Sequence, residues 1–142
     1  KLRDANTTEI DPKTSHPIID LMPEQKKLML EKNYGGTMRL GNYPCQLIKG
    51  SIAQKAYDQN KILERHRHRF EFNNKYWPRM EKAGLKVAGI FPKVKLVEIV
   101  ELKNHPFFVG VQFHPEFKSR PLNPHPLFRE FAKAAVNYKK RR

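Results

Sequence analysis

Residues 85–113, LKVAGIFPKVKLVEIVELKNHPFFVGVQF, decide the fold that we expect for this chain. Three runs rich in β-branched and aromatic residues lie within this stretch, at 85–91, 96–102 and 107–113, and such runs are typical of β-strands. The turn at 103–106 is short, so the last two strands should pair in antiparallel fashion. The stretch therefore predicts a sheet that contains antiparallel strands.

Further strands and short helices are predicted on the N-terminal side of this stretch. Ser51 is expected to cap the first helix, and Pro78 falls in or near the first turn of the second, which Gly84 closes. The segment 23–33 mixes charged residues with Leu and Met, which suits either an amphipathic helix or a charged loop. The expected strands cover 18–22, 37–41, 45–48 and 64–72, and the expected helices cover 52–57 and 75–83.

The C-terminal segment 127–138 carries large apolar residues at a spacing of three to four, which predicts a terminal amphipathic helix. A basic tail at 139–142 follows it. This strand-rich order with flanking helices is typical of an α/β or α+β layered domain. At 142 residues and 16.7 kDa, the chain has the size of one folding unit or of part of a larger one.

The chain is strongly basic, with 28 Lys and Arg residues against 14 Asp and Glu residues and a formal net charge of +14. An excess of this size indicates an anionic partner, and nucleic-acid-binding modules are one class of protein that has it. No stretch reaches the roughly 20 consecutive apolar residues of a membrane helix, and the first residues lack the apolar core of a signal peptide. We therefore expect a cytoplasmic protein that does not bind a membrane.

A histidine and a carboxylate lie two residues apart in the sequence HPE at 114–116, where the last predicted strand ends. An imidazole acts as a general base when a second group fixes its tautomer and orientation, and Glu116 can do this for His114 if the intervening proline makes the chain turn. The alternative is structural: His114 would cap the strand, and Glu116 would pair with Lys118 or Arg120. No nucleophile lies beside the pair in the sequence.

Arginines alternate with histidines in the segment ERHRHRFEFN, which starts at Glu64. On a strand, Arg65, Arg67 and Arg69 would share one face, where acidic neighbours or a bound anion must relieve their repulsion. A guanidinium binds a carboxylate through two parallel hydrogen bonds, which suits a site for an amino-acid backbone as well as for a phosphate. The alternative is a solvated edge face with salt bridges to Glu64 and Glu71.

The segment GGTMRLG, residues 35–41, places three glycines around Arg39. This composition suits a mobile loop that faces an anion. The segment lacks the spacing of a Walker A motif or of a dinucleotide-binding fingerprint, so the signal is a general one.

Cys45 is the only cysteine of the chain. It cannot form an intrachain disulfide or supply a zinc cluster by itself, and we expect no metal site. A nucleophile elbow needs small residues on both sides of the nucleophile, whereas Pro44 and Gln46 flank this thiol. We therefore interpret Cys45 as a core or edge residue.

Four segments carry a family resemblance when they are taken together. They are GGTMRLG at 35–41, ERHRHRFEFN at 64–73, LVEIVEL at 96–102, and VGVQFHPEFKSRP with PHPLF between 109 and 128. They closely resemble the CTP synthase family, specifically the back half of its C-terminal class I glutamine amidotransferase domain. HPE occurs across the class I amidotransferases, whereas RHRHR and GGTMRLG are specific to this family. The resemblance runs from about Asp4 to about Val136 and implies that residues 1–142 are the C-terminal part of one such α/β domain.

The resemblance implies roles for four residues. In this family a cysteine attacks the side-chain amide of glutamine, which gives a glutamyl thioester and ammonia. The histidine of HPE, here His114, shuttles protons, and the glutamate, here Glu116, orients it. The last arginine of RHRHR, here Arg69, matches the residue that grips the α-carboxylate of glutamine. Glu9, which closes the stretch that begins at Ala5, matches the residue that receives the α-ammonium group.

The resemblance also implies partners beyond glutamine. The GGTMRLG loop looks like part of a lid associated with GTP activation, which points to Gly36, Thr37 and Arg39. The whole enzyme of this family uses ATP with magnesium to aminate UTP to CTP, and it forms a homotetramer. The family's glycine-flanked cysteine elbow and its synthetase domain have no counterpart in this sequence. We therefore expect residues 1–142 alone to hydrolyse no glutamine and to bind no cofactor.

A basic nucleic-acid-binding module is the alternative function. The charge of +14 supports it, together with aromatic residues near the arginine-rich segment. In that case the three arginines of the segment should contribute comparably to a salt-dependent affinity for oligonucleotides. Another class I amidotransferase would require HPE without RHRHR, which is not the pattern of this sequence.

Overall fold

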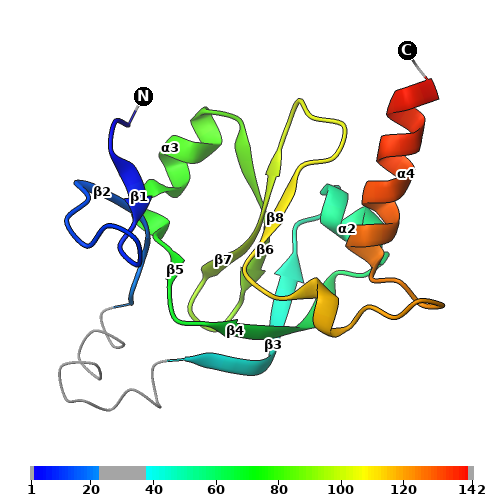
Figure 1. The fold of residues 1–142 in the computed structure, drawn as a ribbon, viewed down its shortest axis with the longest axis horizontal. Coiled ribbons are helices and arrows are strands. Elements are labelled where there is room, and N and C mark those ends of the chain that lie inside the picture. The colour runs from blue at the N-terminus through cyan, green and yellow to red at the C-terminus, as the bar shows by residue number, and fades with distance from the viewer. Residues whose placement is uncertain (1, 23–37, 141–142) are drawn as a thin grey trace.

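The computed structural model describes residues 2–22 and 38–140, which form eight strands with helices on both sides (Figure 1). The helices are α2 (Ile52–Tyr57), α3 (Trp77–Lys82) and α4 (Pro126–Lys140), with short 3-10 helices η2 (Asn74–Tyr76) and η3 (Pro115–Phe117). The strands are β1 (Ala5–Thr7), β2 (His16–Asp20), β3 (Arg39–Leu47), β4 (Lys61–His68), β5 (Glu71–Phe72), β6 (Leu85–Phe91), β7 (Leu96–Leu102) and β8 (Val109–Val111).

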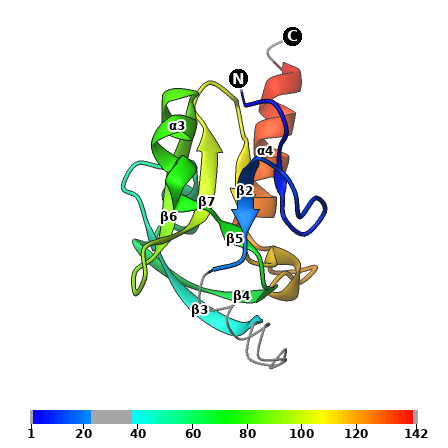
Figure 2. The same ribbon diagram turned by 90° about the vertical axis from the view of Figure 1, so that its left-hand side faces the viewer.

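The strands form two sheets. The larger sheet has the order β4-β3-β6-β7-β8 with antiparallel neighbours throughout, and the smaller has the order β1-β2-β5 with a parallel β1–β2 pair. Helices α2 and α4 lie together on one side of the larger sheet, and α3 lies near the smaller sheet on the other (Figures 1 and 2). The prediction of an α/β fold with antiparallel strands and a C-terminal helix is confirmed.

Two apolar clusters hold the layers together. The smaller cluster joins β6 and β7 to α3 and the smaller sheet, through Phe72, Val87 and Val97 with Trp77 and Met80 packed against them. The larger cluster lies between the larger sheet and helices α2 and α4. Its buried members are Cys45, Leu47, Ala53, Ala56, Ile62, Ala88, Ile99, Phe113 and Leu127. Strand β7 is covered on both sides, so most of its residues are buried, including Glu98 and Glu101.

The structure corrects several predicted strands. The strands expected at 37–41 and 45–48 belong to one strand, β3, which continues through Gly41. Gly41 has a φ of 104°, a backbone angle that glycine adopts without strain, so the glycine bends the strand instead of ending it. The strand expected at 107–113 is limited to β8, and the single strand expected at 64–72 is divided between β4 and β5. The segment 23–33 and residues 35–37 lie outside the described residues.

Helix α2 begins as the sequence predicts, and it has a second cap that the sequence does not reveal. The Ser51 side chain accepts a hydrogen bond from the backbone N–H of Gln54 at 3.0 Å. The buried carboxylate of Glu101 on β7 accepts hydrogen bonds from the N–H groups of Ile52 and Ala53 at 2.9 and 2.7 Å. A strand of the sheet thus satisfies the free N–H groups of the first helical turn. Among the described residues, no helix is long and apolar enough to cross a membrane.

We expect Glu101→Ala to lower the free energy of unfolding by about 2 to 3 kcal/mol, because it leaves one buried and one partly buried N–H group without acceptors and removes an anion from a helix N-terminus. Denaturant unfolding followed by circular dichroism measures this change. Glu130→Ala is the matched control, since Glu130 pairs with Arg129 and Lys133 on the surface of α4, and its loss should cost less than about 0.5 kcal/mol. Equal effects of the two substitutions would contradict the capping role.

Candidate active site

A cavity of about 380 Å³ collects charged residues from distant parts of the sequence. Glu9 lines it from the turn after β1, and Arg67 and Arg69 line it from the end of β4 and the connection that follows. Ile19, Met38, His68, Phe70 and Gln112 complete the lining. Two residues expected to hold the opposite ends of an amino acid, Glu9 and Arg69, therefore lie on the wall of one cavity.

The position of Arg69 follows from the end of β4. Strand β4 pairs with β3 as far as His68, whereas β5 pairs with β2 from Glu71 onwards. Arg69 and Phe70 connect the two sheets, so Arg69 does not belong to the strand face that carries Arg65 and Arg67. The predicted common face of the three arginines is therefore wrong at Arg69.

Glu71 also differs from the prediction. The period-two pattern placed it on the arginine face, but it is buried, with 2% of its surface exposed. Its carboxylate accepts hydrogen bonds from Arg39 at 3.2 Å and from the Gln112 side chain at 3.4 Å. The alternative of a solvated edge face is correct in part, because β4 is an edge strand of the larger sheet and Arg65 and Arg67 are exposed. The expected salt bridges of these arginines to Glu64 and Glu71 are wrong, because both carboxylates are buried and have other partners.

His114 and Glu116 are in direct contact. His114 Nδ1 lies 2.7 Å from Glu116 Oε1, and the imidazole stacks on the Phe117 ring with centroids 4.8 Å apart. The backbone N–H of His114 donates to the carbonyl of Arg65 at 2.9 Å, which attaches this loop to β4. Among the described residues, Nε2 of His114 has no hydrogen-bond partner. The contact fixes one ring nitrogen and leaves the other available for proton transfer.

The electrostatics of the pair favour an ionised carboxylate. A hydrogen bond from its own backbone N–H, followed by the bond with His114, lowers the pKa of Glu116 below its usual value. Lys118 instead contacts the Leu63 carbonyl, and Arg120 donates to backbone carbonyls of its own loop. The alternative pairing of Glu116 with Lys118 or Arg120 is therefore wrong.

His114 does not line the cavity, but Gln112 does, two residues before it along the chain. Sequence reasoning missed Gln112, Met38 and Ile19 as lining residues, since none of them carries a charge. Met38 and Gln112 lie in segments that carry the family resemblance, but no role was expected for either residue. The sequence identified Arg67 only as one of three alternating arginines and not as a residue that lines a cavity. The cavity forms where the two sheets meet, and no pattern within a short stretch of sequence predicts how the sheets are placed.

Arg39 lies in the interior and not on an exposed loop. The side chain is 9% exposed, its Nη2 lies 2.8 Å from Glu98 Oε1, and its guanidinium stands over the rings of Tyr43 and Phe91. The expected contact of Arg39 with GTP is therefore not supported by its buried position between the carboxylates of Glu71 and Glu98. Gly36 and Thr37, the other residues of the expected lid, lie outside the described residues.

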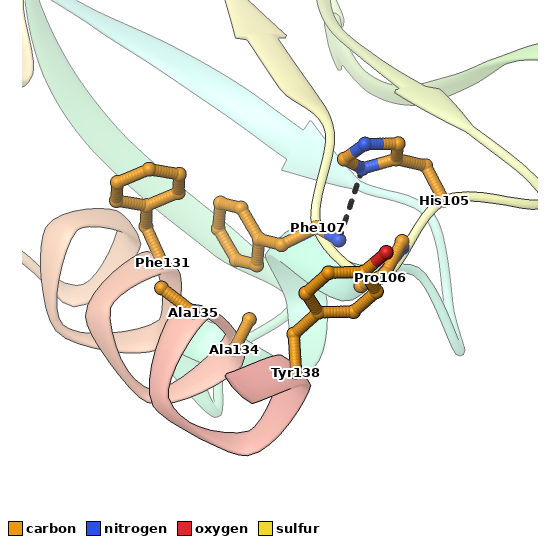
Figure 3. Close-up of a pocket in the computed structure, with 7 residues that line it drawn as sticks. All are labelled: His105, Pro106, Phe107, Phe131, Ala134, Ala135 and Tyr138. Carbon is orange, nitrogen blue, oxygen red and sulfur yellow. Dashed lines mark hydrogen bonds between the residues drawn. The ribbon is translucent and has the colours of Figure 1, made fainter. Parts of the chain in front are cut away.

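A second cavity, of about 350 Å³, lies between α4 and the β7–β8 connection (Figure 3). Phe107 and Phe131 lie next to each other in its lining, in an edge-to-face contact with ring centroids 5.9 Å apart. Its other lining residues are His105, Pro106, Ala134, Ala135 and Tyr138. These side chains offer no carboxylate or guanidinium for the two ends of an amino acid. In the described part of the chain, no group of three or more His, Cys, Asp or Glu residues is placed to hold a metal ion.

Comparison with known proteins decides the family. Residues 17–134 match the family model described as glutamine amidotransferase class-I, which covers most of the chain. The chain belongs to the class-I glutamine amidotransferase family. Within this amidotransferase, the HPE motif, the arginine-rich strand and the cavity lining other than Glu9 fall inside the matched region.

The amidotransferase is similar to proteins named CTP synthase. It is 59% identical to the one from Caldanaerobacter subterraneus subsp. tengcongensis and 61% identical to the one from Fibrobacter succinogenes, over 97% of this chain in each case. It spans about a quarter of the length of these curated relatives. The solved structure of Trypanosoma brucei CTPS, described as a glutaminase domain with bound acivicin, matches with a TM-score of 0.85 and 36% identity. That match covers 94% of this chain and 51% of the other.

The burial and the pKa of Cys45 indicate whether this residue can act as a nucleophile. The thiol is fully buried, and burial, with the nearby Glu98 carboxylate, raises its pKa to about 12. We expect it to react with a thiol reagent at pH 8 roughly 100-fold or more slowly in the folded chain than in the unfolded chain. Labelling with and without guanidinium chloride measures this ratio. Rapid stoichiometric labelling without denaturant would contradict the interpretation of Cys45 as a core residue.

Proposed function

We propose that this chain is the glutamine-hydrolysing part of a CTP synthase and supplies ammonia for the ATP-dependent amination of UTP to CTP. The class I amidotransferase family and the similarity to CTP synthases support glutamine as the substrate. The observation that carries the proposal is the cavity that both Glu9 and Arg69 line. In this proposal Arg69 binds the α-carboxylate of glutamine and Glu9 binds the α-ammonium group.

The proposed chemistry needs a thiolate from outside residues 1–142, because Cys45 is buried and poorly ionised. The thiolate attacks the side-chain amide carbon of glutamine, and His114 gives a proton from Nε2 to the departing nitrogen, so that ammonia leaves. His114 then takes a proton from the water that attacks the glutamyl thioester, which releases glutamate and restores the thiolate. Glu116 holds Nδ1 and stabilises the imidazolium in both steps.

The remaining features belong to the same proposal. ATP with magnesium, UTP and CTP would bind outside these residues, GTP would act as an activator, and the whole protein would be a cytoplasmic homotetramer. No observation favours the alternative of a nucleic-acid-binding module. Arg67 and Arg69 line the cavity, whereas the Arg65 guanidinium stands 6.0 Å from the Phe117 ring centroid, so the three arginines do not form one equivalent row.

We expect Arg69→Ala in the full-length gene product to raise KM for glutamine about 100-fold, because loss of a charge-assisted pair costs on the order of 2 to 4 kcal/mol. Ammonia-dependent CTP formation should be nearly unchanged. Steady-state assays with L-glutamine and with ammonium chloride measure the two activities. Arg65→Ala is the matched control, since Arg65 lies outside the cavity. Equal loss of both activities with folding preserved would refute the assignment.

Glu116→Gln tests the orientation of His114. The amide keeps a hydrogen-bonding group near Nδ1 but removes the negative charge, so kcat with glutamine should fall by about 10- to 1000-fold while KM changes little. The ammonia-dependent reaction is the internal control. An unchanged kcat with glutamine would show that the observed contact has no part in proton transfer.

A further inference from the structure

A buried group of three charges has no role in the proposed chemistry. The Arg39 guanidinium at the start of β3 lies between Glu71 on β5 and Glu98 on β7. Its Nη1 is 3.2 Å from both oxygens of Glu71, and its Nη2 is 2.8 Å from Glu98. The side chains are 9%, 2% and 0% exposed, respectively. We call this group the buried triad.

The buried triad is poorly suited to a purely stabilising role. Two carboxylates share one guanidinium, and burial raises the pKa of Glu71 to about 7 and raises the pKa of Glu98 as well. Burial also lowers the pKa values of the neighbouring His66 and His68 to about 3 and about 4, so neither imidazole supplies a compensating charge near neutral pH. Apolar side chains of similar volume are often at least as stabilising as buried ion pairs. The arrangement therefore indicates that the buried triad serves to hold particular side chains in a fixed geometry.

Glu71 connects the buried triad to the cavity. Its Oε2 accepts a hydrogen bond from Gln112, and its Oε1 lies 3.5 Å from Nδ1 of His68. Both residues line the cavity: Gln112 directly follows β8, and His68 is the last residue of β4. The backbone that carries Arg69 spans the short distance between His68 and Glu71. The Glu71 carboxylate thus contacts two residues of the cavity lining, Gln112 and His68, without lining the cavity itself.

We propose that Glu71 is a positioning residue for glutamine binding, which holds the Arg69 connection and Gln112 in place while Arg39, itself paired with Glu98, fixes its carboxylate. The inference rests on the proposed function, since it takes Arg69 and Glu9 as the groups that bind glutamine. Glu71 does not contact the substrate. It acts through the residues that line the cavity.

The test uses the full-length gene product with Glu71→Gln and Arg39→Lys. Each substitution should raise KM for glutamine at least 10-fold, with a smaller change in kcat and with ammonia-dependent activity retained. Arg39→Lys keeps the charge but loses the two-pronged geometry of the guanidinium. Glu71→Asp, which keeps the carboxylate, should restore part of the lost affinity.

Glu64→Gln is the matched control. Glu64 is equally buried, but its partners are Tyr57, His125 and, at 3.9 Å, Lys118, and none of these partners lines this cavity. This substitution should leave KM for glutamine within about twofold, even if it lowers the melting temperature.

Three outcomes would overturn the inference: an unchanged KM in both folded variants, an equal fall of glutamine- and ammonia-dependent kcat, or unfolding of both variants in thermal melts. The last result would make the buried triad a stabilising element only. If the unsubstituted protein has no glutamine-dependent activity, the proposed function itself fails, and the positioning role fails with it. That failure is separate, because it is seen before any substitution is made.

Discussion

The change of sheet between His68 and Glu71 is the constraint on which the rest of the structure depends. Strand β4 is paired with β3 up to His68, and β5 is paired with β2 from Glu71, so only two residues connect the sheets. The crossing places Arg69 on the cavity wall and turns Glu71 into the interior. A buried carboxylate needs a partner, and Arg39, opposite His68 in the register of β3 and β4, supplies it.

The features that could be predicted from the sequence are those with local causes. Strands β6 and β7 have the predicted bounds, because both are short apolar runs limited by turns, and the Ser51 cap lies next to the helix that it begins. The contact of His114 with Glu116 spans two residues, and a proline between them turns the chain. In each case the interacting groups are close enough in the chain for their spacing to determine their geometry.

The features that could not be predicted depend on partners far away in the sequence. The alternation of ERHRHRFEF continues through 69–72, and nothing in those letters shows that β2 will pair with the last two residues. The burial of Arg39 depends on Glu71 and Glu98, and three nearby glycines made its segment resemble an exposed loop. The segment that contains Gln112 carries the family resemblance, but its sequence did not predict the contact with Glu71, since this contact forms only when the end of β8 and β5 are brought together.

The separation of buried from exposed charged residues explains why the net charge was a poor guide to the ligand. Four glutamates of the described structure, Glu64, Glu71, Glu98 and Glu101, are buried, whereas among the described Lys and Arg residues Arg39 alone is buried with them. The surface is therefore more basic than the formal charge of +14 indicates. The cavity is different, because Arg67 and Arg69 on its wall are opposed by Glu9 and, from behind, by Glu71. Such a local balance suits a zwitterion, whose two charges each need a partner at a fixed separation, better than it suits a polyanion.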